Sequence, residues 1–168
     1  MARVERSLLL LVPASTAYQV VADVSAYPEF LPGCDAVEVL QEQLLDEGVS
    51  EVTAKVIASA RGLRQEFVTV NTCQPFERIE MNLKEGPFER LDGCWTFKPL
   101  GDEGCKVELT LEFVAKGMLM KTLSGVLGPV SDRMVDAFAQ RIQALAEGYE
   151  RAGDLCRVES HVELLGGG

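Results

Sequence analysis

The chain has 168 residues, of which 47% are hydrophobic and 25% are charged, so it is long enough for one domain with a sizeable core. No apolar run approaches the roughly 18–20 residues that a membrane-spanning helix needs. The formal net charge of −10 argues against direct DNA binding and against a broad electrostatic grip on anionic lipid. We therefore expect a cytoplasmic protein.

Cysteine and histidine usage narrows the chemistry further. The five cysteines are scattered without a C-x-x-C pair: Cys34, Cys73, Cys94, Cys105 and Cys156. This pattern is typical of reduced thiols rather than of a disulfide framework or a zinc site. The single histidine, His161, lies near the C-terminus, outside the body of the domain. Most hydrolytic triads and most zinc sites need a histidine within the domain. We predict neither a metal site nor a required cofactor.

The N-terminal part of the chain predicts one strand and two short helical segments. Residues 3–12 alternate and then become continuously apolar, which predicts a strand that ends at Pro13. A helix follows, with Ser15 as its expected N-cap. Residues 27–33 read Tyr-Pro-Glu-Phe-Leu-Pro-Gly, and their two prolines limit this segment to a short helical turn or a loop.

From residue 35 to about residue 115 apolar and polar side chains alternate. Turn sequences rich in glycine and proline, such as Gly86-Pro87, divide this region into six segments at roughly ten-residue spacing. Strict alternation over short segments indicates strands with one dry face and one wet face. We predict six strands joined as an antiparallel meander.

After Gly117 the apolar spacing changes to three and four residues. Large apolar side chains recur at this spacing as far as Tyr149, which predicts a long amphipathic helix. Gly128-Pro129 falls within the stripe and is expected to kink the helix, because proline removes an amide donor. The periodicity decays afterwards, so we predict one domain over residues 1–150 and a flexible C-terminal tail over residues 151–168.

Together these elements predict an α+β fold in which a curved antiparallel sheet of six to seven strands surrounds the C-terminal helix. Only that helix is long enough to cover the dry face of the sheet. Such an arrangement tends to leave an interior space, and ligand pockets are largely apolar. The expected lining consists of large apolar side chains, each of which is also consistent with ordinary core packing: Phe67, Leu91, Trp95, Met118, Leu119, Leu123, Leu127, Val130 and Met134.

Three large apolar side chains lie in the proline-bounded segment, at Tyr27, Phe30 and Leu31. A segment this short seldom carries three such groups unless they pack on something. They form either a plug at the end of the core, or a functional element that is a lid gating the cavity or a membrane-touching tip.

Several segments of the chain resemble those of a known family. They are residues 21–24, 27–34, 85–91 and 93–97, together with the helix around Phe138. On these residues the chain resembles the START-like helix-grip proteins of the coenzyme Q-binding and polyketide cyclase-like type, a family that includes a branch of ribosome-association toxins. The likeness covers about residues 3–150.

The resemblance implies a hydrophobic tunnel for an isoprenoid quinone such as ubiquinone. Tyr27, Pro28, Phe30, Leu31 and Pro32 would form its entrance. We therefore expect a non-enzymatic carrier that binds this lipid, touches the inner membrane transiently, and supports respiratory electron transport or quinone biosynthesis. From the register of the strand, we expect Arg90 and Thr96 to be the polar side chains that contact the quinone ring.

Three alternatives remain open at this point. A cyclase-like enzyme would draw its acid–base groups from Asp23, Asp35, Glu85, Arg90 and Asp92, or a nucleophile from Cys34 or Cys94. The toxin branch would bind the large ribosomal subunit and inhibit translation. A protein-interaction module would have a completely filled core.

Overall fold

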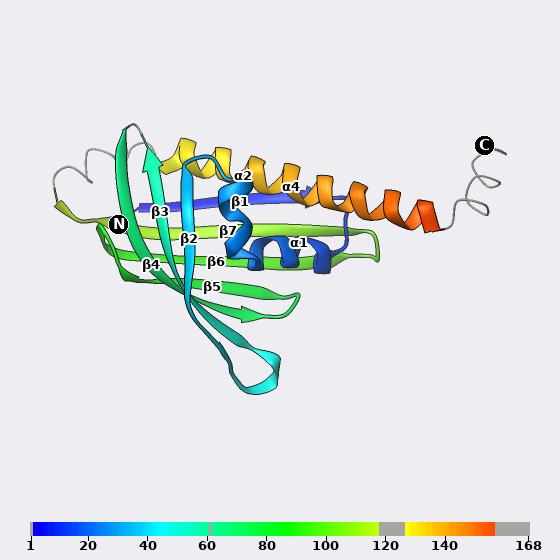
Figure 1. The fold of residues 1–168 in the computed structure, drawn as a ribbon, viewed down its shortest axis with the longest axis horizontal. Helices are drawn as coiled ribbons and strands as arrows, with labels where there is room; N and C mark the ends of the chain where they lie inside the picture. The colour runs from blue at the N-terminus through cyan, green and yellow to red at the C-terminus, as the bar shows by residue number, and fades with distance from the viewer. Residues whose placement is uncertain (1, 61, 118–126, 157–168) are drawn as a thin grey trace.

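The computed structural model describes residues 2–60, 62–117 and 127–156. A single seven-stranded antiparallel sheet dominates it, with strand order β1-β7-β6-β5-β4-β3-β2 (Figure 1). The strands are β1 (Ala2–Leu10), β2 (Cys34–Leu44), β3 (Ser50–Ala60), β4 (Leu63–Gln74), β5 (Arg78–Glu85), β6 (Phe88–Leu100) and β7 (Gly104–Ala115). The predicted strand after the N-terminus and the predicted six-strand meander are both confirmed.

The sheet forms because apolar side chains in these strands recur at every second position. In β7, Val107 and Leu109 are buried while Glu108 between them is exposed. Residues on alternate positions of a strand point to opposite faces, so this pattern gives the sheet one dry face. β1 pairs with β7 by residues far apart in the sequence, from Ala2 opposite Phe113 to Leu10 opposite Cys105.

Three short helical segments join β1 to β2: α1 (Ala14–Ala22), η1 (Val24–Ala26) and α2 (Tyr27–Phe30). The predicted N-cap is wrong, because the cap position of α1 is Pro13 and no side chain caps the helix. Instead, the backbone carbonyl of Pro13 accepts hydrogen bonds from the amides of Thr16 and Ala17. The proline-bounded segment is a helical turn, one of the two predicted forms.

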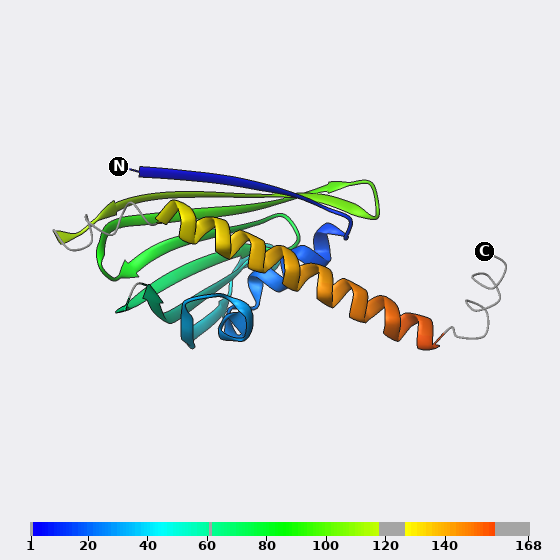
Figure 2. The same cartoon turned by 90° about the horizontal axis from the view of Figure 1, so that it is seen from above.

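The long helix α4 (Leu127–Cys156) lies along the dry face of the curved sheet, and its C-terminal part projects past the edge of the sheet (Figure 2). It buries Val135, Phe138 and Ile142, which follow one another at three- and four-residue steps. Pro129 lies two residues after Leu127, the first described residue of α4, and the residues before Leu127 lie outside the described ranges. The predicted kink at Pro129 therefore stays a prediction.

The main core lies where α1, α4 and the sheet meet. Ala17, Ile142 and Cys105 are completely buried there, one from each of these three layers. A smaller cluster of Val4, Phe88 and Phe113 lies at the opposite end of the central strands. The predicted sheet wrapped around a C-terminal helix is confirmed. The helix continues to Cys156, past the predicted domain boundary at residue 150, which stays a prediction.

Candidate functional site

A cavity of about 300 Å³ lies between the dry face of the sheet and α4. Its walls come from β3 to β7, from the η1–α2 segment and from α4. At one end the lining includes Ala60, an exposed residue beside the β3–β4 turn, so the cavity reaches the surface there. At the other end it stops against the buried side chains of Ile79, Trp95 and Phe138.

An aromatic cluster closes the buried end of the cavity. The ring of Phe138 on α4 packs edge-to-face against three others, with centroid distances of 5.0 Å to Trp95 and 5.3 Å to both Tyr27 and Phe30. Edge-to-face packing at these distances is favourable beyond simple burial. The cluster joins the sheet, α2 and α4, and therefore fixes where α2 sits over the cavity.

Polar contacts hold α2 in the same place. The Tyr27 hydroxyl donates a hydrogen bond to the backbone carbonyl oxygen of Val21, and burial raises the pKa of that hydroxyl well above its ordinary value. Arg141 on α4 lies 5.1 Å from the Phe30 ring and 3.4 Å from a carboxylate oxygen of Glu29. These contacts anchor α2 to α1 on one side and to α4 on the other.

A small number of polar side chains interrupt the apolar lining. Thr69 and Asn71 occupy successive inward positions on β4 and are 3% and 7% exposed, and Ser131 faces the cavity from α4. The Oδ1 atom of Asn71 is buried and has no hydrogen-bond partner within the protein. A buried polar atom without a partner costs free energy, so native proteins carry few of them.

Seven of the predicted lining and gate residues do line the cavity: Tyr27, Leu31, Phe67, Leu91, Trp95, Val130 and Met134. Phe30 does not, because it faces a separate open groove between α2 and α4 that also contains Pro28, Arg133 and Asp136. Met118, Leu119 and Leu123 lie outside the described residues. Leu127 is the first residue of α4, and its side chain is likewise outside the described set.

The sequence analysis missed most of the lining that comes from β3, β4 and β5. Ala54, Val56 and Ala58 face the cavity from β3, as do Thr69 and Asn71 from β4. Alternation along β3 and β4 already placed these residues on the dry face, and their small or polar side chains were the available signal. The predicted lining consisted of large apolar side chains, although small side chains are what leave space in a core.

The acid–base and thiol candidates do not converge on the cavity. Asp23, Asp35 and Glu85 are exposed, and Asp35 accepts a hydrogen bond from the Ser59 hydroxyl at 2.5 Å. Of the two thiol candidates only Cys34 lines the cavity, and burial together with the neighbouring Asp35 raises the pKa of its thiol. None of the side chains described as lining the cavity is a carboxylate or a cation.

The two polar side chains offered for a quinone ring are also misplaced. Arg90 lies on the wet face of the sheet, where its Nε is 2.5 Å from Asp92, and a second nitrogen is 3.7 Å from Glu112. This pairing lowers the pKa of Asp92. Thr96 follows Trp95 in β6 and therefore points to the opposite, wet face. Both residues lie on the face of β6 that points away from the cavity.

Within the described ranges, no three His, Cys, Asp or Glu side chains gather where they could hold a metal ion. The described helices also include none that is both long and apolar enough to cross a membrane.

A model of the family described as "Polyketide cyclase / dehydrase and lipid transport" matches residues 10–139. The chain belongs to this family. The match runs from Leu10, the last residue of β1, to residue 139 in α4 and includes every residue that lines the cavity, which confirms the START-like resemblance. The description of the family names both cyclase or dehydrase enzymes and lipid transport.

Curated relatives carry one recurrent name. A protein named ribosome association toxin RatA from Pseudomonas aeruginosa is 43% identical over 143 residues, which cover 84% of this chain and 96% of the relative. The protein of the same name from Escherichia coli K12 is 36% identical over 142 residues, covering 84% of this chain and 87% of the relative. The similarity therefore extends over nearly the whole length of both relatives.

Solved structures share the fold. A START superfamily protein from Mycobacterium smegmatis superposes with a TM-score of 0.71 at 20% identity, covering 85% of this chain and 98% of that protein. The ZhuI aromatase/cyclase from Streptomyces sp. R1128 gives a TM-score of 0.72 at 20% identity, covering 84% of this chain and 93% of the enzyme. At these identities the likeness concerns the architecture alone, and it confirms the predicted helix-grip fold.

The predicted quinone carrier is wrong. The relatives that match nearly end to end are named for ribosome association, which was the stated alternative. The cavity also offers little space for such a lipid. An apolar cavity of about 150 Å³ holds a benzene ring, so about 300 Å³ corresponds to a two-ring molecule rather than to a quinone head with a long isoprenoid tail.

Proposed function

We propose that this protein associates with the large ribosomal subunit and acts there as a translation-inhibiting toxin, in the cytoplasm. The 43% identity over 96% of the length of a ribosome association toxin is the observation that carries the proposal. The aligned region also covers 84% of this chain.

The proposed activity is binding rather than catalysis. The fold occurs in an aromatase/cyclase, yet the acidic and basic side chains considered for catalysis here lie outside the cavity, and of the thiol candidates only Cys34 lines it. Asp92 is paired with Arg90, and the pairing holds the carboxylate in its charged form. A general acid or base works best with a pKa near the working pH, whereas this pair moves the carboxyl group away from that range.

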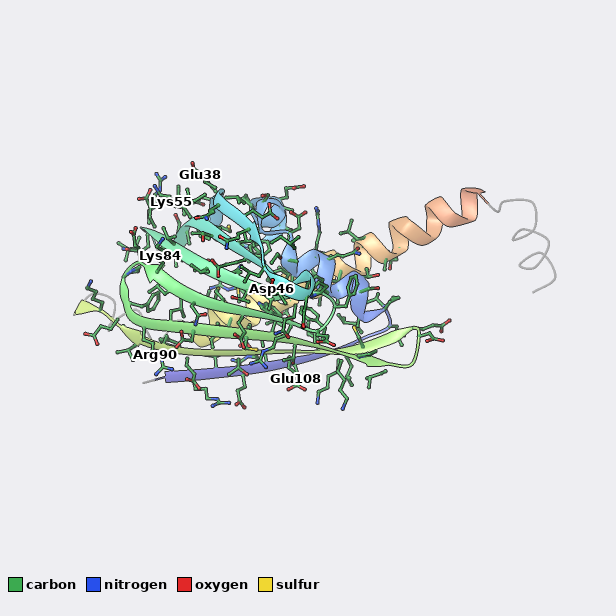
Figure 3. The ribbon with its side chains drawn as sticks, turned by 90° about the horizontal axis from the view of Figure 1, so that it is seen from below. Glu38, Asp46, Lys55, Lys84, Arg90 and Glu108 are labelled. Carbon is green, nitrogen blue, oxygen red and sulfur yellow. The ribbon has the colours of Figure 1, made fainter. Side chains whose placement is uncertain are left out.

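The charges on the surface favour contact with ribosomal protein rather than with the phosphates of ribosomal RNA. Many of the cations are already neutralised, because carboxylates lie within ion-pair distance of Arg3, Arg6, Lys55, Arg78, Arg90, Lys106 and Arg141. In Figure 3 the labelled cations Lys55, Lys84 and Arg90 follow one another across the sheet between Glu38 and Glu108, and Lys55 and Arg90 are each paired with a carboxylate. Phosphate recognition needs clustered cations instead.

Exposed apolar side chains at two ends of the sheet supply an alternative kind of contact. Leu9 and Leu11 are 74% and 93% exposed at the end of β1, and Leu40 and Leu44 are 50% and 76% exposed on β2. Exposed apolar groups that cluster on a surface often mark protein–protein contacts. We propose that at least one of these two pairs is buried against a basic ribosomal protein.

Sedimentation of the purified protein with separated large and small ribosomal subunits tests the proposal. We expect the protein to migrate with the large subunit and to reduce the joining of the two subunits. Because few phosphate contacts are expected, retention should change little between low and moderate salt. Migration with neither subunit would contradict the proposed function, and migration with the small subunit alone would contradict the choice of subunit.

Matched variants separate the two kinds of contact. Lys84, Lys98 and Arg133 have no carboxylate within 4.0 Å in the described structure, so replacing all three with Gln removes unpaired cations without breaking ion pairs. We expect this variant to bind as the parent does. We expect L9S/L11S or L40S/L44S to bind less well. The opposite pattern would favour contact with RNA.

A further inference from the structure

Among the side chains that the structure describes, the carbonyl oxygen of Asn71 is the one buried polar atom that has no hydrogen-bond partner. Asn71 is 7% exposed. It lies on β4, opposite Val52 of β3 and Met81 of β5. Neither neighbour has a side-chain hydrogen-bond donor. No group in the described ranges donates to this oxygen, so its donor would be a bound molecule or water.

The cavity that Asn71 lines limits the charge, the size and the polarity of a molecule that could bind there. Its lining carries no charged group among the described residues, so a bound anion or cation would lose its hydration without compensation. Its volume of about 300 Å³ is about twice that of an apolar cavity that accepts benzene. The walls near Asn71 are apolar and include Ile79, Trp95 and Leu109.

We propose that the cavity binds a neutral, two-ring-sized apolar molecule that carries one hydroxyl or N–H group, and that this group donates a hydrogen bond to Oδ1 of Asn71. The ring system fills the apolar volume, and the single donor satisfies the single orphaned acceptor. A long-chain lipid would be too large, and a molecule with acceptors only would leave the oxygen without a partner. This site is independent of the proposed contact with the ribosome, which uses the outer surface.

Water is the competing occupant. An ordered water in a protein interior usually makes about three hydrogen bonds. Water near Asn71 could use Thr69, which lies two residues away on the same strand and faces the same cavity. Most of the remaining lining is apolar, and apolar cavities stay dry. The two occupants differ in one measurable respect, because water gives no selectivity between molecules that have a donor and molecules that lack one.

Calorimetric titration of the full-length protein with three probes of nearly equal shape tests the proposal. The probes are 2-naphthol, which has a donor, and naphthalene and 2-methoxynaphthalene, which have none. We expect 2-naphthol to bind about tenfold more tightly than either of the others, because a ligand without the donor leaves the buried acceptor unpaired. Equal affinity for the three probes, or no binding of any of them, would overturn the proposal and assign the site to water.

Two variants locate the effect. Asn71→Leu removes the acceptor while it keeps the branching and the number of side-chain heavy atoms, and it is expected to abolish the preference for 2-naphthol over naphthalene. Asn82→Leu makes the same replacement on the exposed face of β5, where Asn82 donates to Asp92, and is expected to keep the preference. A preference retained in the Asn71 variant would contradict the assignment. Should that variant fail to fold, the comparison of probes on the unmodified protein still decides.

Discussion

The hydroxyl of Tyr27 donates a hydrogen bond to the backbone carbonyl oxygen of Val21, six residues earlier in the chain. Val21 lies in the last turn of α1, where backbone carbonyls have no partner within the helix. The tyrosine therefore completes the end of α1 and at the same time sets the position of α2. We expect Tyr27→Phe to lower the free energy of unfolding by about 1–2 kcal/mol, because it leaves that carbonyl unpaired.

Urea unfolding of the variant measures this loss, and Tyr18→Phe is the matched control. The Tyr18 hydroxyl interacts with the thiol of Cys73, and a thiol is a weak hydrogen-bonding group. The control should therefore be less destabilised than Tyr27→Phe. Equal losses would show that the carbonyl of Val21 finds another partner when the tyrosine hydroxyl is removed.

The sequence was sufficient to predict the fold because local and long-range signals agree. Alternation in residues 35–115 placed Val107 and Leu109 on one face, and the helical spacing of Met134, Phe138 and Ile142 predicted the helix that covers it. The kink at Pro129 stays a prediction, because the pattern does not mark where the helix begins and a proline has opposite effects in the first turn and in the interior.

The candidate site was harder to predict for a physical reason. A cavity is made by what is small or polar at dry-face positions, such as Ala54, Ala58 and Asn71. Periodicity reveals the face of the sheet that a residue occupies, but it does not reveal whether side chains from the opposite wall of the cavity fill the space next to it. Function was harder still to predict, because the same fold occurs in an aromatase/cyclase and in a START superfamily protein. The similarity to ribosome association toxins was found only by comparison of sequences over nearly the full length of these relatives.

Gly33 is under a backbone constraint that a second glycine lacks. Gly33 and Gly48 both have positive φ angles, of +81° and +77°, which disfavour side chains. A Cβ on Gly33 would come within 2.7 Å of the carbonyl oxygen of Ser59, whereas nothing lies within 4 Å of a Cβ on Gly48. Gly48→Ala should cost about 1 kcal/mol, and Gly33→Ala should cost clearly more because the backbone must shift.

The amide of Ser59 also donates to the carbonyl of Gly33 at 2.8 Å, so a shift there would loosen the contact between β2 and β3 beside the cavity. Thermal unfolding of the two variants provides the comparison. The prediction is wrong if both alanine variants melt at the same temperature.

Phe138 is the residue whose truncation should damage the structure most. Its side chain is 1% exposed and contacts rings on the sheet and on α2. Removing a buried aromatic ring in such a setting costs about 3–5 kcal/mol. We expect this loss for Phe138→Ala in urea unfolding, and less than about 1 kcal/mol for Leu145→Ala on the same helix, where the side chain is 46% exposed. Similar losses in the two variants would mean that α4 does not organise the core.

The stability of the protein should fall in alkaline solution because of Tyr18. Burial raises the pKa of its hydroxyl to about 12, from 10.0 in an unstructured chain. The folded state therefore keeps this proton at a pH where the unfolded state has released it. The stabilisation is fully present below about pH 10 and is lost as the pH rises from about 10 to 12.

The variant Tyr18→Phe has no proton to release at this position in either state. Its free energy of unfolding should decline less steeply with pH above 10 than that of the parent, by at most about 1.4 kcal/mol per pH unit. The remaining slope comes in part from Tyr27, whose pKa is raised as well. Urea titrations at pH 9.0, 10.5 and 11.0 measure the two slopes, and parallel lines would show that the ring of Tyr18 ionises as readily in the folded protein as in the unfolded chain.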